Sequence, residues 1–277
     1  DESALRQFLV DAGVRGFESA EWPQRRIVGQ SGELEGTVTS AGGRAAMVLT
    51  FVKEDGRWRI HHLSSPASSR DAADIRELRK RAEADDATAQ AQLGEMYYAG
   101  SGVDRDGSEA EKWLRKAAER GVARAQFTLA LVYDEGQGVQ TDKAQAIKWY
   151  RSAADQGFAK AQFNLGYSYS HGDGVEQDLG EAVHWYRKAA DQGFVAAEIN
   201  LGNLYANGLG VAKDDSEAVA WYRKAAEQGS AEAQFRIGDA FAEGRGVERD
   251  EARAVEWYRK AADQGLAKAR DKLAGMH

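Results

Sequence analysis

Small and apolar residues recur along most of the chain at helical spacing. In the stretch that begins at Ala159, the residues Ala161, Leu165 and Tyr169 stand four positions apart, which places them on one face of a helix. The same stripe returns every 36 residues, and five copies follow one another without a gap, beginning at residues 87, 123, 159, 195 and 231. We number these copies repeats 1 to 5. A fixed period of this length predicts stacked structural repeats.

Each copy carries signals for two helices joined by a turn. Gly172 and Gly174 predict the end of the first helix, because glycine adopts left-handed backbone angles without a steric cost. Asp178 predicts the N-cap of the second helix, and Glu181, three residues later, is placed to complete a capping box. The equivalent aspartates are Asp106, Asp142, Asp214 and Asp250. In repeat 5, Arg253 replaces the acidic partner, so that helix is expected to start less firmly.

The second helix of every copy carries a large aromatic residue beside small ones. The recurring tryptophans are Trp113, Trp149, Trp185, Trp221 and Trp257. A tyrosine follows the tryptophan in four of the copies, and paired alanines follow in all five. An aromatic side chain at a fixed repeat position is far more typical of a packed core than of a ligand site. We therefore predict that these rings fill the space between neighbouring hairpins.

The repeat resembles the Sel1-like repeat, a relative of the tetratricopeptide repeat. The resemblance rests on A-x-A-Q-x-x-L-G-x-x-Y, the G-x-G-V loop, the aspartate cap and W-Y-R-K-A-A-x-x-G, and it covers residues 87–266. The departures are Ala130 for glycine, Leu114 for tyrosine and Glu198 for glutamine. The resemblance implies a right-handed α-solenoid. Residues 71–86 and 267–277 align with half repeats, and their more polar sequences suit the ends of a stack.

The first 66 residues follow a different pattern. Residues 3–17 place apolar positions on one helical face. From Arg25 onward the period shortens to two, and an Asp55-Gly56 pair stands where a tight hairpin would turn. We predict a small α+β domain over residues 1–66, a helix with about three antiparallel strands, and a boundary in the Ser- and Pro-containing stretch at residues 64–71. The predicted fold class is thus mainly α, an α-α superhelix over residues 67–277 preceded by this α+β domain.

Composition narrows the possible chemistry. The chain of 277 residues has no cysteine and a formal net charge of -7, which argues against thiolate chemistry and against nucleic acid as a partner. His61 and His62 are neighbours on a predicted strand, so their side chains point to opposite faces and are poorly placed to share a metal. Serine-hydrolase, zinc-protease and P-loop motifs are absent from the sequence. We therefore expect no enzyme, no cofactor and no metal site.

Positions that differ among the copies are the candidates for binding. On the first helix these are the sixth, ninth, twelfth and thirteenth positions of each copy, which lie opposite the packed stripe and would line the concave trough of a solenoid. The predicted partner-binding residues are Tyr98, Thr128, Leu131, Asp134, Asn164, Tyr167, His171, Asn200, Asn203, Asn207, Arg236 and Asp239. Asparagine side chains can hold the backbone of an extended peptide, while tyrosine and leucine supply apolar anchors.

These features favour a non-enzymatic scaffold or adaptor that binds a protein or peptide in the trough. The family resemblance implies work in the bacterial cell envelope, and because the chain begins at Asp1 we expect a removed signal peptide and a periplasmic location, with the cytoplasm left open. Two alternatives remain: an immunity-type inhibitor of a toxic effector, and a small-ligand sensor acting through the N-terminal sheet. Self-association through the apolar middle strand of residues 1–66 is a further possibility, and no membrane insertion is expected.

Overall fold

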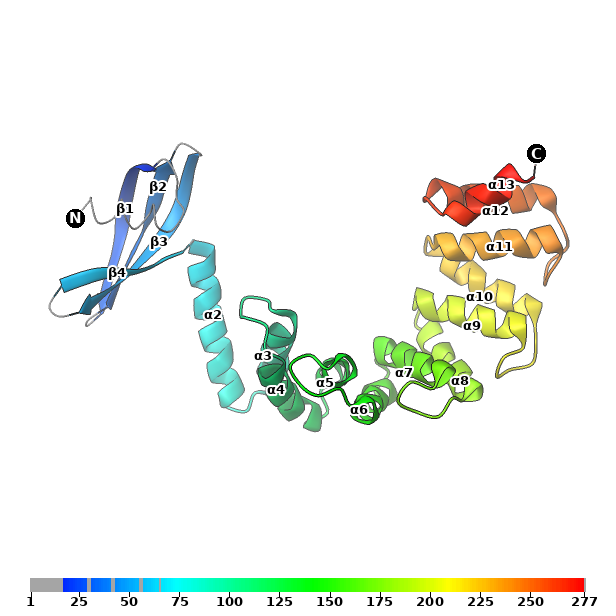
Figure 1. The fold of residues 1–277 in the computed structure, drawn as a ribbon, viewed down its shortest axis with the longest axis horizontal. Helices are drawn as coiled ribbons and strands as arrows, with labels where there is room; N and C mark the ends of the chain where they lie inside the picture. Colours follow the sequence, from blue (N-terminus) through cyan, green and yellow to red (C-terminus); the bar gives the residue numbers. More distant parts are fainter. Residues whose placement is uncertain (1–16, 29–30, 41–42, 55–56, 65, 277) are drawn as a thin grey trace. The chain divides into compact units, whose positions relative to one another are not determined.

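The chain divides into two compact units, residues 1–80 and residues 81–277. The computed structural model describes residues 17–28, 31–40, 43–54, 57–64 and 66–276, with side chains from residue 74 onward. The helix predicted within residues 3–17 lies almost entirely outside these ranges, so the α+β character of the N-terminal part and its predicted boundary remain predictions. Figure 1 follows the two units along the chain.

The first unit contains one antiparallel sheet with the strand order β1-β2-β3-β4. Its strands are β1 (Phe17–Val28), β2 (Ser31–Ser40), β3 (Gly43–Glu54) and β4 (Arg57–Ser64). Glu54 pairs with Arg57 across the predicted hairpin turn. His61 lies in β4 where the register slips, between the pairs Thr50 with His62 and Phe51 with Ile60. The middle strand of the prediction is β3, which pairs with a strand on each side.

The first strand begins earlier than the sequence pattern indicated. We expected strand periodicity from Arg25, whereas β1 starts at Phe17. The alternation of apolar and polar residues is broken before Arg25 because the pairing of β1 with β2 shifts between Glu21 and Gln24, around Pro23. Proline has no backbone N–H to donate, so it is tolerated at an irregularity of an edge strand, which β1 is in this sheet.

The second unit consists of stacked helical hairpins. The helix α2 (Pro66–Glu83) leads into it. We expected a linker at residues 64–71, but the helix already begins at Pro66, because proline is well suited to the first helical position. The helices that follow are α3 (Ala87–Ala99), α4 (Gly107–Glu119), α5 (Ala123–Glu135), α6 (Lys143–Asp155), α7 (Ala159–His171), α8 (Leu179–Ala190), α9 (Val195–Asn207), α10 (Asp215–Glu227), α11 (Ala231–Glu243), α12 (Glu251–Asp263) and α13 (Ala267–Ala274). The first helices α5, α7, α9 and α11 each pack on the second helix of their own repeat and on that of the preceding repeat, and α13 packs on α12.

The predicted helix ends are confirmed, with one correction. The five aspartates cap the second helices; Asp178 Oδ1, for example, accepts from the backbone N–H groups of Gly180 and Glu181 at 2.9 and 3.0 Å. The reciprocal half of the capping box is wrong. The Asp178 N–H donates to the Tyr169 carbonyl instead, while the Glu181 carboxylate accepts from the Trp185 indole N–H at 3.0 Å. The carboxylate thus satisfies the N–H of a buried indole rather than the cap.

The alanine, leucine and aromatic stripes form the core of the stack. Leu165 and Leu201 are fully buried, and four of the five recurring tryptophans are less than a tenth exposed. Trp257, in the last repeat, is more open than the others. The first helices end at glycines with left-handed backbone angles, as at Gly172, where φ is 71°. These observations confirm that the recurring residues serve stacking.

A chain of glutamines joins consecutive repeats. The Gln162 side-chain amide donates to the Ala154 carbonyl of the preceding repeat at 3.0 Å, and its carbonyl accepts from Gln192 at 2.7 Å. Gln126 and Gln156 repeat this pattern in repeat 2. The N-terminal half repeat takes part as well, because Gln90 donates to the Ala82 carbonyl of α2. These bonds satisfy backbone carbonyls that would otherwise be buried without donors.

Candidate functional site

The surface that could bind a partner is the outward side of the first helices. We call it the first-helix face and define it by the sixth, ninth, twelfth and thirteenth positions of α5, α7, α9 and α11. Each position is placed by its helix, which is anchored on the opposite side by the buried stripe. The face therefore presents side chains from four stacked helices in a regular array.

Tyrosines of the second helices reach this face from beneath. The rings of Tyr186, Tyr222 and Tyr258 cross a glycine of the first helix, and a Cβ on Gly202 would lie 2.5 Å from Cε1 of Tyr222. The hydroxyls then meet first-helix side chains: Tyr222 donates to Asn203 Oδ1 at 2.8 Å, and Tyr258 donates to Asp239 Oδ1 at 2.8 Å. The sequence assigned these tyrosines to the core alone. The signal available in the sequence was the glycine that recurs in the first helix, because a residue without a side chain there leaves room for the tyrosine ring.

Between repeats 2 and 3 the face is closed by internal contacts. We call this place the 2–3 joint. Lys143 contacts Asp134 at 2.6 Å and Asp173 at 3.0 Å, and Tyr150 donates to Asp134 at 3.2 Å. Burial, together with the Asp134 carboxylate, raises the pKa of Tyr150, while a hydrogen bond with Asn164 lowers it. Asp134 and Asn164, both predicted to contact a partner, are therefore already engaged with Tyr150.

In the middle of the stack, repeat 3 exposes an aromatic pair. Tyr167 is 46% exposed, an unusual degree for a large side chain in this unit. Its ring stacks on His171 with 4.0 Å between ring centroids, and His171 Nδ1 lies 2.9 Å from the Tyr167 carbonyl oxygen. Ser170 lies within 2.7 Å of the same imidazole nitrogen. These contacts fix the histidine beside the tyrosine and leave the rings open to solvent.

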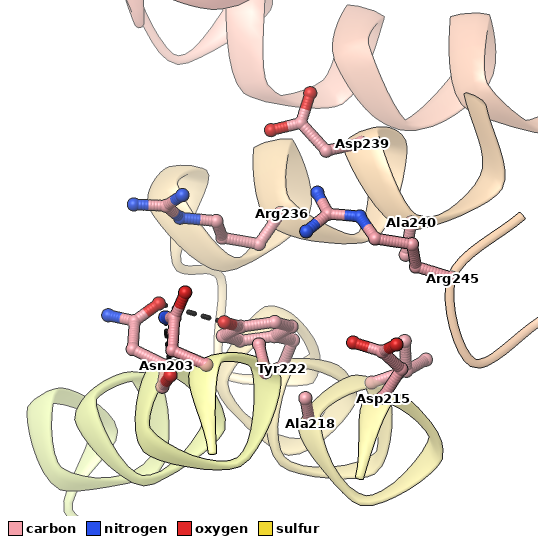
Figure 2. A pocket seen from close by; sticks show the side chains of 11 residues that line it. Asn203, Asp215, Ala218, Tyr222, Arg236, Asp239, Ala240 and Arg245 are labelled. Atoms are coloured by element: carbon pink, nitrogen blue, oxygen red, sulfur yellow. Dashed lines mark hydrogen bonds between the residues drawn. The ribbon is translucent and has the colours of Figure 1, made fainter. Parts of the chain in front are cut away.

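Between repeats 4 and 5 the face is hollowed. This 4–5 joint contains a hollow of about 80 Å³ lined by residues of α9, α10 and α11 and by Arg245 of the following loop. Figure 2 shows Arg236 and Arg245 extending over it from one side, with Tyr222 and Asn203 opposite. Burial raises the pKa of Tyr222 to about 12, and the charges of Arg236 and Arg245 oppose that rise. A hollow of this size suits one chemical group rather than a whole cofactor, since ligand pockets usually hold about 300 Å³ or more.

The remaining predicted residues differ in how much they offer. Thr128 is buried and donates to the Arg124 carbonyl of its own helix at 3.1 Å, so its hydroxyl is not available to a ligand. Tyr98 donates to Glu135 at 3.0 Å, and burial followed by that carboxylate raises its pKa to about 12. Asp239 is buried and pairs with Lys272 at 3.3 Å. Leu131 is half-buried.

Two predicted asparagines support their neighbours. Asn200 hydrogen-bonds to the Tyr186 hydroxyl, which burial gives a raised pKa. Asn207 donates to the Asn203 carbonyl at 2.7 Å.

Asp215 and Arg245 line the hollow but were not predicted, because they lie outside the first helices, in a second helix and a loop. Most of the predicted residues on the face therefore gather in three separate places rather than in one continuous site.

In the part of the chain that the structure describes, no three or more His, Asp or Glu side chains gather in a way that could hold a metal ion. None of the described helices combines the length and apolar character that a membrane span requires.

Comparison with known proteins identifies the repeat. The family model for the Sel1 repeat matches residues 87–122, 123–158, 159–194, 195–230 and 231–266, which are the five copies found from the sequence period. The chain belongs to the Sel1 repeat family. As a Sel1 repeat protein it shares a fold whose helical repeats generally mediate protein interactions. A search of the curated proteins returned no match.

Solved bacterial structures share the fold. The protective antigen c5321 of uropathogenic Escherichia coli strains is 41% identical, with a TM-score of 0.70 over 73% of this chain and 43% of that one. This Sel1 repeat chain thus matches less than half of the antigen's length. A Sel1 repeat protein from Oxalobacter formigenes is 37% identical, with a TM-score of 0.63 over 74% of this chain and 87% of that one. The immunity protein Pa5087 from Pseudomonas aeruginosa is 26% identical over 66% of this chain and 67% of that one, with a TM-score of 0.41, too low to support a functional comparison.

Proposed function

We propose that this Sel1 repeat protein is a non-enzymatic scaffold that binds a protein or peptide along its first-helix face. One observation carries the proposal: Tyr167 and His171 form an exposed, stacked aromatic pair in the central repeat. Exposed aromatic residues held in a fixed conformation are typical anchors of protein interfaces, because they bury a large area at low conformational cost. The two hydrogen-bonding contacts on the His171 imidazole supply that fixed conformation.

The setting of this pair supports a macromolecular partner. Asn200 and Asn203 of the next repeat lie half-buried on the same face. They offer amide groups of the kind that hold an extended backbone. The family as a whole supports the same reading, since its repeats generally mediate protein interactions. The cell-envelope location belongs to this proposal, and the inhibitor and small-ligand alternatives remain predictions.

Affinity capture from cells of the native host tests the proposal. We expect proteins captured by the wild-type chain to be lost with the double variant Tyr167→Ala/His171→Ala and retained with His184→Ala. His184 is an exposed histidine on α8 in the same repeat, on a second helix, so its replacement controls for loss of an exposed imidazole. Quantitative mass spectrometry of the three captures gives the readout. Equal recovery with the double variant and the wild type would rule out the aromatic pair as an anchor.

A further inference from the structure

The hollow at the 4–5 joint is built on the same repeat positions as the 2–3 joint, but of the five residues compared only the tyrosine is the same. Moving forward by two repeats takes Tyr150 to Tyr222, Asn164 to Arg236 and Asp173 to Arg245. The same step takes Asp134 to Ala206 and Lys143 to Asp215. The 2–3 joint holds its own carboxylate, Asp134, between the Tyr150 hydroxyl and the Lys143 ammonium. The 4–5 joint has an alanine at that position.

Two arginines lie at the 4–5 joint, where this internal carboxylate is missing. Arg236 pairs with Glu232 at 3.0 Å and Arg245 pairs with Glu243 at 2.9 Å, and in both cases the contact is made by Nε. Among the described residues, neither arginine has a partner at its terminal Nη groups. The four Nη atoms carry donors suited to the two oxygens of a carboxylate.

The acidic residues that line the hollow are already paired. Asp239 accepts from the Tyr258 hydroxyl and contacts Lys272. Asp215 pairs with Lys213 at 3.4 Å rather than with Arg245. Their charges are therefore offset by groups of the chain itself. The Nδ2 amide of Asn203 has no partner in the described part of the structure and adds a further donor on the opposite side (Figure 2).

From this comparison we propose that the 4–5 joint binds a carboxylate of the peptide or protein partner, held by Arg236 and Arg245. The carboxylate takes the place that Asp134 fills at the 2–3 joint. A volume of about 80 Å³ accommodates such a group but not a whole drug-sized molecule. This inference rests on the proposed function, because it specifies what the partner must carry. The carboxylate comes from an acidic side chain or from the C-terminus of the partner.

Three peptides separate these sources. The first is an acetylated and amidated alanine pentapeptide with a central aspartate, and the second has asparagine in its place. The third is an acetylated alanine pentapeptide with a free C-terminal carboxylate. Binding is followed by NMR, using the side-chain amides of Asn203 and Asn207 and the Nε–H signals of the two arginines, up to about 10 mM peptide. We expect saturable shifts with the first or the third peptide and none with the second. The peptide that binds identifies the source, whereas no shift with either acid, or equal shifts with the asparagine peptide, would overturn the inference.

Two variants test the residues. Arg236→Gln/Arg245→Gln is expected to weaken acid-peptide binding by about tenfold or more, because charge-assisted hydrogen bonds are lost. The charge-matched control is Arg223→Gln/Arg259→Gln, which removes two exposed arginines of α10 and α12. If Arg223→Gln/Arg259→Gln weakened peptide binding as much as Arg236→Gln/Arg245→Gln, or more, the assignment would be contradicted.

The second variant restores the missing internal group. Ala206→Asp should place a carboxylate beside Tyr222, as Asp134 lies beside Tyr150, and so compete with the peptide. We expect peptide binding to fall about tenfold while the melting temperature stays the same or rises, since the new charge meets two guanidinium groups. Undiminished binding in a folded Ala206→Asp protein, verified by circular dichroism, would overturn the proposal. If no peptide bound at the 4–5 joint while partner capture still depended on Tyr167, the carboxylate site would be refuted and the proposed function would stand.

Discussion

The 2–3 and 4–5 joints are built on the same repeat and differ in what fills the first-helix face. At the 2–3 joint, Lys143 connects Asp134 to Asp173, so charges of the chain satisfy one another. At the 4–5 joint, Arg236 and Arg245 keep their outer donors available beside a hollow. The tyrosine beneath is the same residue type in both, held at the same place by the stacked helices.

This comparison separates stacking from recognition. The residues that recur in every repeat set the distance and angle between helices and are the same at both joints. The positions that vary decide whether a joint is closed by its own charges or left open. Variation on the first-helix face therefore controls where along the stack a partner finds groups without an internal partner.

Gly202→Ala should be the most damaging of the small substitutions. Its Cβ would lie 2.5 Å from the Tyr222 ring, which forms one wall of the hollow. We expect a loss of about 1–3 kcal/mol in the free energy of unfolding, measured by urea denaturation, because overpacking forces the ring or the backbone to move.

The 2–3 joint supplies the matched control for that substitution. Ala130 occupies the position of Gly202 there, beneath Tyr150, and is fully buried. Ala130→Gly should cost about 0.5–1 kcal/mol, the usual cost of glycine within a helix, plus a small loss of packing. If Gly202→Ala were as mild as a surface mutation, the tight passage of the Tyr222 ring over its glycine would be refuted.

Glu198→Gln should stabilise the protein at neutral pH. Glu198 is 2% exposed and stands in the glutamine chain, where Gln162 donates to a carbonyl of the preceding repeat. An ionised carboxylate can accept from Gln228, as it does at 3.0 Å, but it has no proton to donate. Burial raises the pKa of Glu198, with smaller opposing effects from Lys224 and Gln228. We expect a gain of about 1–2 kcal/mol in the variant, the usual cost of a buried group left unsatisfied.

The pH dependence of that gain has a definite sign. The folded pKa is raised, so folding favours the protonated acid. Stability from this group is fully present below the unfolded pKa and is lost as the pH rises through the folded pKa. The difference between Glu198→Gln and the wild type should therefore widen from acid to neutral pH in urea-unfolding series. A difference that stays constant across this range would show that folding does not shift the pKa of Glu198.

Much of this fold could be predicted from the sequence because its determinants are local. The aspartate caps and the left-handed glycines depend on neighbours within a few positions, and the period of 36 residues repeats these local signals five times. The capping box was wrong because the backbone N–H of each cap aspartate donates to a carbonyl of the preceding helix, as Asp178 does to Tyr169, and so is not available to the glutamate. The start of the N-terminal strand was predicted too late because Pro23 interrupts its alternation where the register shifts.

The candidate site was less accessible to sequence reasoning because it depends on contacts between repeats. The first-helix positions follow from the helical period, but the tyrosine hydroxyls that reach them from the second helices were not anticipated. Arg245 comes from a loop, and Asp215 from a second helix, so neither follows from the periodicity of a first helix. Whether a joint is open depends on Ala206 together with residues of the next repeat, and such a combination becomes visible only when the repeats are stacked.

The smallest expected effect concerns the charge that closes the 2–3 joint. Lys143→Met should cost about 0.5–1 kcal/mol of unfolding free energy, because its two ion pairs are partly exposed and screened by solvent. The matched variant Lys213→Met removes a lysine that is more exposed than Lys143 and that forms one ion pair, with Asp215 at 3.4 Å, among the described residues. It should change stability by a few tenths of a kcal/mol at most. The difference between the two variants should shrink in about 1 M salt, where ion pairs at the surface are screened. Equal costs for the two lysines would mean that Lys143 does not close its joint, and the contrast between the two joints would then rest on shape alone.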